Sequence, residues 1–371
     1  IEIARPVGVV AAITPSTNPG ATPANNIVNA LKARNAIVLA PSPKGASTLA
    51  LLLAFVHAEL DRIRAPRDLV QTLPAPVSRE HTRELMRQAD IVVATGSQNN
   101  VRAAYESGTP ALGVGAGNVA VIVDESADLA DAAGKIARSK TFDHATSCSS
   151  ENSVIAVDAV ADALLAALAK HGGVRLTPDE GARLERAMFA GGRLGSDYVA
   201  QSAATIAALA GLEREACRGA RFLIVDVGAV GPDAPFSGEK LSPVLAFYRA
   251  ADFDAAAGRA EELLGYQGAG HSVGLHTARP ERATRLGLTL PVCRVIVNQA
   301  HCFATGGAYD NALPFSLSMG CGSWGGNSFS DNLNVRHFMN VTRVVHPLAP
   351  GRVREPTEDE LFGAYRRRHG V

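Results

Sequence analysis

The chain has 371 residues, 47% of them hydrophobic, which is long enough for about two domains with a core each. Its 36 basic residues balance 36 acidic ones without a long run of like charge, which argues against nucleic acid or an anionic membrane and favours a small-molecule partner. No apolar stretch approaches the ~18 residues that a membrane helix needs, so we expect a soluble protein.

Strand-like apolar runs alternate with helical patterns over residues 7–123. The run "GVVAAIT" leads into "TPANNIVNALKARN", in which Thr22 and Pro23 predict a helix N-cap and first helical residue. The apolar spacing predicts one buried face of that helix, made by Ile27, Val28 and Leu31. The alternation continues through "AIVLA", "LVQTL" and "DIVVATG" to "VAVIVD", which indicates right-handed βαβ units on a parallel sheet.

A second αβ series follows residue 145, from "SVIAVD" to "CRVIVN", and the last quarter turns rich in glycine and aromatic residues. We therefore expect a first domain over residues 1–145, a second over residues 146–335, and a closing segment over residues 336–371. This boundary places Cys148 at the seam between two domains, where ligand clefts prefer to lie.

The cysteines are scattered and form no CxxC pair: Cys148, Cys217, Cys293, Cys302 and Cys321. This pattern indicates neither a disulfide framework nor a metal site, and it predicts free thiols in a reducing cytoplasm. The chain opens with Ile1 inside a strand-like run and without a signal peptide. We expect a fragment, or a chain numbered from its first ordered residue.

Cys148 in "FDHATSCSSENSVIAV" has two interpretations. A free cysteine often packs as a small hydrophobic residue. This one is flanked by serines and a threonine and immediately precedes a predicted strand, which favours a nucleophile that adds to a carbonyl carbon. If the segment is helical, Glu151 and His144 lie on the face of Cys148.

Asn18 in "AITPSTNP" ends the first predicted strand. Its amide is either the donor to a developing oxyanion or the start of an Asx-turn before Pro19. The Gly-rich loops "ATGSQNN" (94–100) and "GVGAGN" (113–118) do not fit the GxGxxG pattern. The first loop follows a strand and opens a helix, so it is either a phosphate-binding loop or a tight turn.

Together these stretches resemble the coenzyme A-acylating branch of the aldehyde dehydrogenase superfamily. The resemblance runs from Arg5 to the end of the chain, in the branch's order and spacing: "TPSTNP", "VVATGS", "RAAYESGTPALGVGAGN", "FDHATSCSSENSVI", "EKLSPVLA", "YQGAGHSVGLHT" and "GCGSWGGNSFSDN". It implies an α/β, aldehyde dehydrogenase-like fold with two Rossmann-like domains, parallel-rich sheets and an oligomerisation strand near "NVTRVVHP". It further implies a homodimer or homotetramer.

The resemblance also implies roles for single residues. Cys148 is the nucleophile, and Asn18 and the Cys148 backbone N–H stabilise the oxyanion. The residues implied to hold NAD or NADP are Thr14, Pro15, Ser16, Gly96, Ser97, Gly115, Glu239 and Leu241. The N-terminal part of the family's cofactor domain precedes the position of Ile1.

Gly113 marks the branch. Hydrolytic members carry a Glu-Leu-Gly-Gly motif whose glutamate activates water, and the aligned stretch here is "GVGAG". Without that base the acyl-enzyme reacts poorly with water, whereas the thiol of coenzyme A attacks it well. The sequence therefore predicts oxidation of an aldehyde to an acyl-coenzyme A.

The chain departs from its relatives at His144, Ala145 and Asn152, and Ala40 replaces a ribose-binding lysine of the hydrolytic members. Lys44 is then either a phosphate contact or a surface lysine. The segment "NQAHCFATGGAYDNALPFS" resembles succinate semialdehyde and sulfoacetaldehyde members. Candidate contacts for such an anionic aldehyde are His301, Arg102 and Arg336, with His271 near the cleft.

Three rival functions remain at this point. A hydrolytic aldehyde dehydrogenase is disfavoured by Gly113, a non-catalytic nucleotide-binding homologue would show no thiol-dependent turnover, and a reductase of acyl phosphates would require phosphate instead of coenzyme A.

Overall fold

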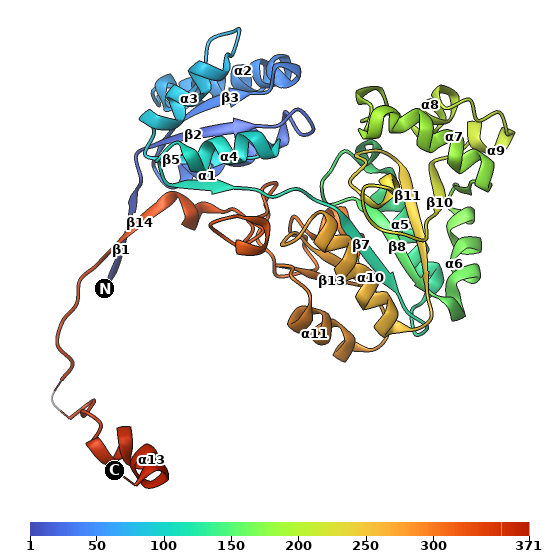
Figure 1. Cartoon of the computed structure of the whole chain (residues 1–371). Coiled ribbons are helices and arrows are strands. Elements are labelled where there is room, and N and C mark those ends of the chain that lie inside the picture. The colour runs from blue at the N-terminus through green and yellow to red at the C-terminus, as the bar shows by residue number, and fades with distance from the viewer. Residues whose placement is uncertain (350, 371) are drawn as a thin grey trace.

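The computed structural model describes residues 1–349 and 351–370. Two αβ lobes lie side by side, joined by the connection between β6 and β7, and a C-terminal tail leaves the body (Figure 1). The predicted α/β class with parallel-rich sheets is confirmed.

The first lobe is a five-stranded parallel sheet in the order β4-β3-β2-β5-β6. Its strands are β2 (Val9–Thr14), β3 (Ala36–Pro41), β4 (Val70–Thr72), β5 (Ile91–Ala94) and β6 (Ala111–Gly113), and its helices are α1 (Ala21–Lys32), α2 (Ala46–Arg62), α3 (Arg79–Gln88) and α4 (Gln98–Glu106). Alternate residues of β2 enter opposite cores: Val10 packs on one face and Ala11 on the other. A strand buried on both faces reads as an uninterrupted apolar run, which is why these strands stand out in the sequence.

Helix α1 differs from its prediction at the start and on one face. Its N-cap is Gly20, and the backbone N–H of Ala21 is held by the Asn18 side chain, so the helix begins before Thr22. The side chain of Val28 is 61% exposed, which leaves it off the buried face.

The second lobe is a seven-stranded parallel sheet in the order β13-β12-β7-β8-β11-β10-β9. Its strands are β7 (Val119–Val123), β8 (Glu151–Val157), β9 (Gly173–Arg175), β10 (Phe222–Asp226), β11 (Val244–Ala250), β12 (Val273–His276) and β13 (Val295–Val297). Its helices are α5 (Leu129–Thr141), α6 (Asp158–Lys170), α7 (Pro178–Met188), α8 (Ala203–Leu209), α9 (Glu215–Arg218), α10 (Phe253–Tyr266), α11 (Pro280–Thr289) and α12 (His301–Ala304). Two large cores cover its faces.

The predicted boundary near residue 145 is too late in the chain. Strand β7 pairs with β8 and β12, so β7 and the following α5 belong to the second sheet. Apolar strands of parallel sheets look alike in sequence, and their pattern does not say which sheet they join. The chain changes sheets within residues 114–118.

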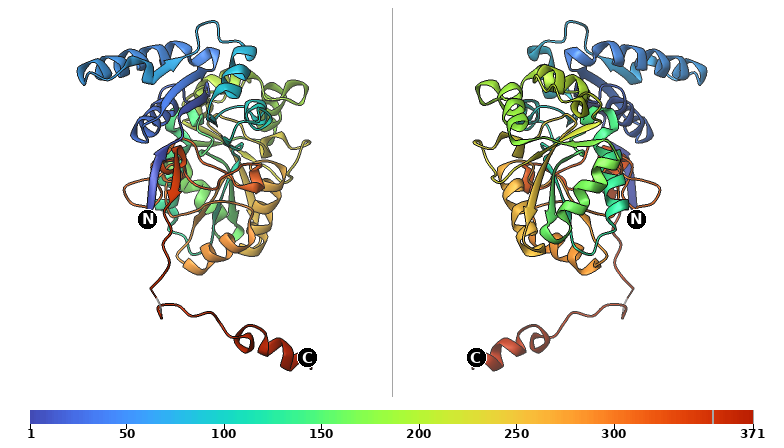
Figure 2. Two further views of the ribbon diagram at one scale, coloured as in Figure 1. Left: turned by 90° about the vertical axis from the view of Figure 1, so that its left-hand side faces the viewer. Right: turned by 90° about the vertical axis from the view of Figure 1, so that its right-hand side faces the viewer.

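The closing segment packs against the first lobe. After η8 (Val335–Phe338), β14 (Met339–Arg343) pairs antiparallel with β1 (Glu2–Pro6) of the same chain, and the two strands run together in Figure 2. Phe338 is buried in the first core, and its carbonyl accepts a hydrogen bond from Asn35 Nδ2 at 2.8 Å. Beyond β14 the tail carries α13 (Glu358–His369) away from both lobes. Pro350 and Val371, which fall in the predicted 336–371 segment, lie outside the described residues.

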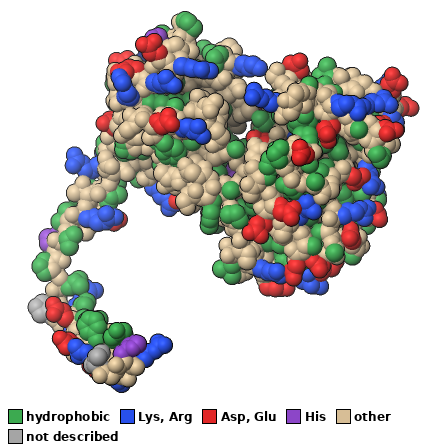
Figure 3. Space-filling view, viewed as in Figure 1, with side chains coloured by type: hydrophobic (Ala, Val, Ile, Leu, Met, Phe, Trp, Pro, Cys, Tyr) green, Lys and Arg blue, Asp and Glu red, His purple; other side chains and the backbone are tan. Residues whose placement is uncertain are grey.

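The carboxyl edge of the first sheet faces the amino edge of the second. The connection runs from the carboxyl end of β6 at Gly113 to the amino end of β7 at Val119, and six residues of chain reach at most about 20 Å. The carboxyl edge of the first sheet therefore lies near the amino edge of the second, and a hollow separates the lobes on the face shown in Figure 3. Ligands of open parallel sheets bind at carboxyl edges, which points to this region as the site. Among the described residues, no helix is long and apolar enough to cross a membrane.

Candidate active site

Cys148 lies in a tight turn directly before β8. The turn is closed by the Ser150 N–H, which donates to the Ser147 carbonyl at 2.9 Å, and the Ser149 N–H donates to Ser147 Oγ at 3.2 Å. The segment is not helical, so the idea that Glu151 and His144 share a helical face with Cys148 is wrong. Glu151 is buried at the start of β8, whereas His144 is exposed. The Cys148 side chain is partly buried.

The connection between the lobes packs directly on this turn. A Cβ atom on Gly117 would lie 2.2 Å from the Cys148 carbonyl oxygen, so only glycine allows this approach. Gly115 packs in the same way on Cys321, whose Sγ would lie 2.9 Å from an added Cβ. Asn327 Oδ1 accepts hydrogen bonds from the backbone N–H groups of Gly115 and Cys321, both at 2.9 Å. Gly115 therefore helps to join the connection to the "GCGSWGGN" loop.

The Cys148 thiol is protonated in the ligand-free protein. Burial raises the pKa of the thiol to about 12, and the nearby Glu239 carboxyl group and Cys321 thiol act in the same direction. A thiolate is the nucleophilic form of cysteine. Forming it requires a positive charge or a proton acceptor beside the sulfur.

Glu239 lies just before β11, the neighbour of β8. Its Oε1 atom is buried and has no hydrogen-bond partner among the described residues, and burial raises the pKa of the carboxyl group to about 8. A buried carboxyl oxygen without a donor is energetically unfavourable. Neighbouring Leu241 has a φ of +46°, and its carbonyl accepts the Ala200 N–H at 3.1 Å. These features leave Glu239 able to accept hydrogen bonds from a ligand's hydroxyl groups.

Three more ionisable groups are buried in the second lobe: Lys140, Glu151 and Lys240. Lys140, at the end of α5, is 1% exposed, and burial lowers the pKa of its amino group to about 7. Burial raises the pKa of the Glu151 carboxyl group to about 7, although attraction to Lys140 opposes that rise. Lys240 is fully buried and donates from Nζ to the carbonyls of Phe236 and Gly238 at 2.6 and 3.0 Å. The second lobe thus holds several ionisable groups close to the nucleophile.

Asn18 stands at the carboxyl edge of the first sheet. Its Oδ1 accepts the Ala21 N–H at 3.2 Å, so the predicted turn is present. Its Nδ2 has no hydrogen-bond partner within the part of the chain that the structure describes. The two interpretations of Asn18 use opposite ends of one amide and do not exclude each other.

The predicted cofactor residues of the first lobe gather at the same edge. Thr14 is buried at the end of β2, Pro15 follows it, and Ser16 is exposed. Gly96 has a φ of +140° and would place a Cβ 3.5 Å from Pro15 Cβ. Ser97 is the N-cap of α4 and accepts the Asn100 N–H at 3.4 Å. The loop 94–100 does join a strand to a helix N-terminus, as predicted.

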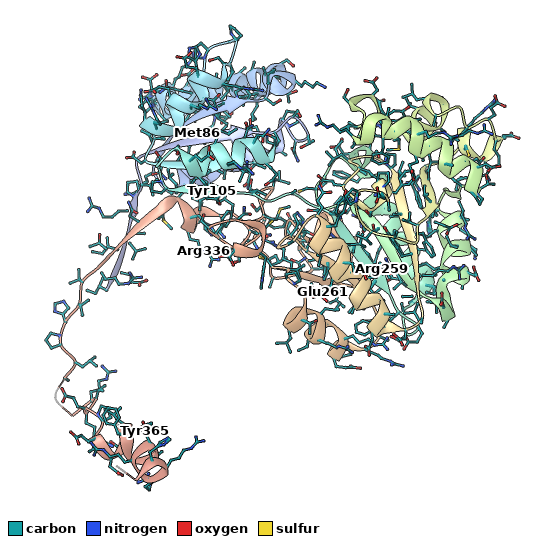
Figure 4. The ribbon with its side chains drawn as sticks, viewed as in Figure 1. Met86, Tyr105, Arg259, Glu261, Arg336 and Tyr365 are labelled. Carbon is teal, nitrogen blue, oxygen red and sulfur yellow. The ribbon has the colours of Figure 1, made fainter. Side chains whose placement is uncertain are left out.

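Gly113 is packed against the side chain of Tyr105. A Cβ atom there would lie 2.7 Å from Tyr105 Cε2 and 2.6 Å from Val101 Cγ1. The Tyr105 hydroxyl accepts the N–H groups of Gly113 and Ser328, each at 3.0 Å. Figure 4 shows Tyr105 at the underside of the first lobe, next to the closing segment. A side chain at Gly113 would therefore overlap Val101 and Tyr105 unless both move.

The predicted substrate contacts differ from one another in burial and in their partners. His271 is fully buried, its Nδ1 lies 2.7 Å from Ser272 Oγ, and burial lowers the pKa of its ring to about 3. His301 is 1% exposed, and burial lowers the pKa of its ring to about 4. Both rings are neutral near pH 7, so neither supplies the positive charge expected for an anionic aldehyde. Arg336 pairs with Asp331, and Arg102 is exposed on α4.

Sequence reasoning missed the residues that act through packing. Lys140 and Lys240 carry the residue type of a solvated surface, and no local pattern marks them as buried. Asn327 and Arg294 lie far from Cys148 in sequence. Arg294 donates to the carbonyls of His271, Gly320 and Ser330, which holds the loops around the site. The density of glycine in "GVGAGN" is the one signal that foreshadows close packing.

Known proteins resemble this chain over its whole length. The family model described as "Aldehyde dehydrogenase family" matches residues 1–178. The acylating sulfoacetaldehyde dehydrogenase of Cupriavidus necator is 63% identical over 369 residues, which cover 100% of this chain and 74% of that protein. The chain belongs to the aldehyde dehydrogenase family.

Solved structures of this aldehyde dehydrogenase family carry the same fold. An acetylating aldehyde dehydrogenase from Geobacillus thermoglucosidasius matches with a TM-score of 0.90 and 37% identity, covering 96% of this chain and 78% of that one. A propionaldehyde dehydrogenase from Rhodopseudomonas palustris, solved with bound CoA and an acylated cysteine, has a TM-score of 0.83 and 26% identity. It covers 92% of this chain and 75% of that one. The resemblance to acylating members is confirmed.

Proposed function

We propose that the protein is a coenzyme A-acylating, NAD(P)-dependent aldehyde dehydrogenase whose substrate is sulfoacetaldehyde. The observation that carries the acylating reaction is Gly113, where Val101 and Tyr105 occupy the space that the Cβ atom of a hydrolytic base would need. The substrate follows from the 63% identity to an acylating sulfoacetaldehyde dehydrogenase. Of the two predicted substrates, sulfoacetaldehyde and succinate semialdehyde, this identity supports sulfoacetaldehyde.

The residues at the facing sheet edges support the covalent part of the reaction. The Cys148 thiolate adds to the aldehyde carbon, and the free Nδ2 of Asn18 and the backbone N–H of Cys148 stabilise the resulting oxyanion. Loss of a hydride from the carbon leaves an acyl thioester on Cys148. The thiol of coenzyme A then attacks that thioester, releases acyl-coenzyme A and returns the thiol of Cys148.

The residues present fit a dinucleotide. The unpartnered Oε1 of Glu239 suits a ribose hydroxyl, and the N-terminus of α4 at Gly96 and Ser97 suits a phosphate. Thr14, Pro15 and Ser16 border that loop. Gly115 of the connection and Leu241 of the second lobe complete the predicted set. When bound, the oxidised nicotinamide accepts the hydride and adds positive charge near the thiol, which favours the thiolate.

We also infer a homo-oligomer, a dimer or tetramer. The ribbon of β1 and β14 is exposed along its length, with Ile3 and Val341 nearly half exposed. An exposed antiparallel edge is a surface that another strand can extend. Sedimentation of the protein measures the assembly.

The deciding experiment measures reduced cofactor formed from sulfoacetaldehyde, succinate semialdehyde and acetaldehyde, each with and without coenzyme A. We expect turnover only with coenzyme A, and the highest kcat/KM with sulfoacetaldehyde. Equal turnover without coenzyme A would mean that another residue activates water and that the product is the free acid. A preference for another aldehyde would overturn only the substrate.

A further inference from the structure

We propose that His301 is a positioning residue that fixes the backbone of the nucleophile turn from behind. This role rests on the proposed function of Cys148 and adds to it a residue that touches neither substrate nor cofactor.

The imidazole of His301 reaches the turn itself. Its Nδ1 lies 2.9 Å from the carbonyl oxygen of Ser149, the residue that follows Cys148. A carbonyl only accepts hydrogen bonds, so Nδ1 carries the proton and donates it. The bond orients the Ser149 carbonyl and hence the peptide next to the nucleophile.

The ring is itself held on several sides. Thr305 Oγ1 lies 3.0 Å from Nδ1 and donates to the His301 carbonyl at 2.7 Å. Gly274 of β12 offers no side chain, and a Cβ there would lie 3.2 Å from the ring's Cδ2. The imidazole therefore sits against bare backbone in one orientation.

The backbone of His301 is tied to the strand that carries the nucleophile. The His301 N–H donates to Glu151 Oε1 at 3.3 Å, and the next residue, Cys302, donates its N–H to Ser139 Oγ at 2.9 Å. Glu151 begins β8 and Ser139 lies near the end of α5, so short helix α12 is anchored to the elements on both sides of Cys148. The neutral ring suits this role, because a fixed donor is needed and a charge is not.

Two substitutions separate the hydrogen bond from the ring. Asparagine places an N–H donor where Nδ1 stands, whereas glutamine places its donor near Nε2, which does not face Ser149. We expect H301Q to lower kcat by about tenfold to a hundredfold, because a displacement of about 1 Å at reacting atoms has effects of that size. We expect H301N to keep kcat within about threefold, and the KM for NAD to stay unchanged in both variants.

A matched control is His276 of β12, which is also buried and neutral but makes no hydrogen bond to the nucleophile turn among the described residues. H276Q should keep wild-type kcat. A kcat for H301Q equal to that of the wild type would overturn the proposal, as would an equal loss in H301N and H301Q. If H301Q does not fold, H301N decides alone: wild-type turnover supports the proposal, and a tenfold loss overturns it.

The rate at which iodoacetamide alkylates Cys148, followed by mass spectrometry, makes the test independent of turnover. If the wild-type protein shows no turnover that depends on Cys148, the proposed function is contradicted, but the inference about His301 is still testable by alkylation. The inference then stands if H301Q changes the alkylation rate severalfold and H301N does not. It fails if the three rates agree.

Discussion

The two facing sheet edges differ in how their side chains are hydrogen-bonded and buried. At the carboxyl edge of the first sheet, the site side chains already serve the local fold: Asn18 holds the start of α1, and Ser97 caps α4. At the amino edge of the second sheet, ionisable groups are buried and short of partners, as Glu239 Oε1 and His301 Nε2 show. The side chains of the first edge are therefore already fixed by hydrogen bonds to the local backbone. The second holds groups whose protonation and reactivity depend on what binds.

The largest effect expected at either edge is loss of the nucleophile. C148A should abolish aldehyde-dependent formation of reduced cofactor, because no other group forms the covalent intermediate. Cofactor binding, followed by fluorescence quenching, should persist. C293S removes another partly buried thiol and should retain activity. Turnover by C148A would refute the central role of this edge.

The first edge takes part in the chemistry if Asn18 is an oxyanion donor. N18D keeps an oxygen for the Ala21 N–H but removes the donor, so the turn survives while stabilisation of the oxyanion is lost. We expect kcat to fall by about 100-fold to 1,000-fold with a melting temperature near that of the wild type. An N18D protein with normal kcat would leave Asn18 with the turn alone.

The junction between the edges is sensitive to added volume. G113A places a methyl group within 3 Å of Val101 and Tyr105, and we expect overpacking of about 1–3 kcal/mol in the free energy of unfolding. Urea titration measures it. G258A, in α10 where an added Cβ meets nothing within 4 Å, is the matched control and should be neutral or stabilising.

The unpaired carboxyl group of the second edge predicts a pH effect. In the folded protein the pKa of Glu239 is raised to about 8, from an ordinary 4.5, so the folded state binds this proton more tightly than the unfolded chain does. Stability from this group is fully present below pH 4.5 and is lost as the pH rises through 8.

E239Q should remove this decline, as melting temperatures of the ligand-free protein from pH 5 to about 8.5 would show. Because Glu239 raises the pKa of the neighbouring Lys140, the difference between the two pH curves reports the interacting pair. We also expect about tenfold weaker cofactor binding above pH 8, where the wild-type acceptor is a charged carboxylate and the variant's amide is neutral. Parallel pH curves for the two proteins would contradict the assignment.

The smallest expected effect concerns the residues with left-handed backbone at the two edges. The first uses Gly96 at a φ of +140°, whereas the second has Asp143, His144 and Ala145 at φ values of 48°, 48° and 57° before the nucleophile turn. Left-handed backbone at a residue with a side chain is unfavourable by about 1–2 kcal/mol. H144G should therefore raise the unfolding free energy by up to about 1 kcal/mol, and G96A should lower it. A loss of stability in H144G would show that the exposed imidazole makes a compensating contact.

Local features of the site were within reach of the sequence. The strand after Cys148, the helix that follows the loop 94–100 and the turn at Asn18 each depend on a few adjacent residues, and each is present. The resemblance added Glu239, which no local pattern marks. Features that depend on distant packing were not accessible. Strand β7 was placed with the wrong sheet, and the sequence did not show that burial lowers the pKa of the His301 ring to about 4.

Burial was the hardest property to predict because it depends on neighbours that the chain meets far away. Gly115 meets Asn327 across 212 positions of the chain, and Glu151 meets the His301 N–H across 150. Side-chain type alone assigns lysine to the surface and histidine to a binding role. The structure reverses both assignments in the second lobe.

The return of the chain to the first core has a consequence for how this protein is divided. Leu333 and Phe338 complete the core that β2 and β3 begin, and Asn35 is hydrogen-bonded to the Phe338 carbonyl. The second lobe is thus an insertion in the first lobe rather than its successor. A fragment that ends at Gly113 would expose the apolar surface that those two side chains cover. The inserted lobe begins and ends at neighbouring points, where Gly115 is hydrogen-bonded to Asn327, so it is the unit that can be replaced as a whole.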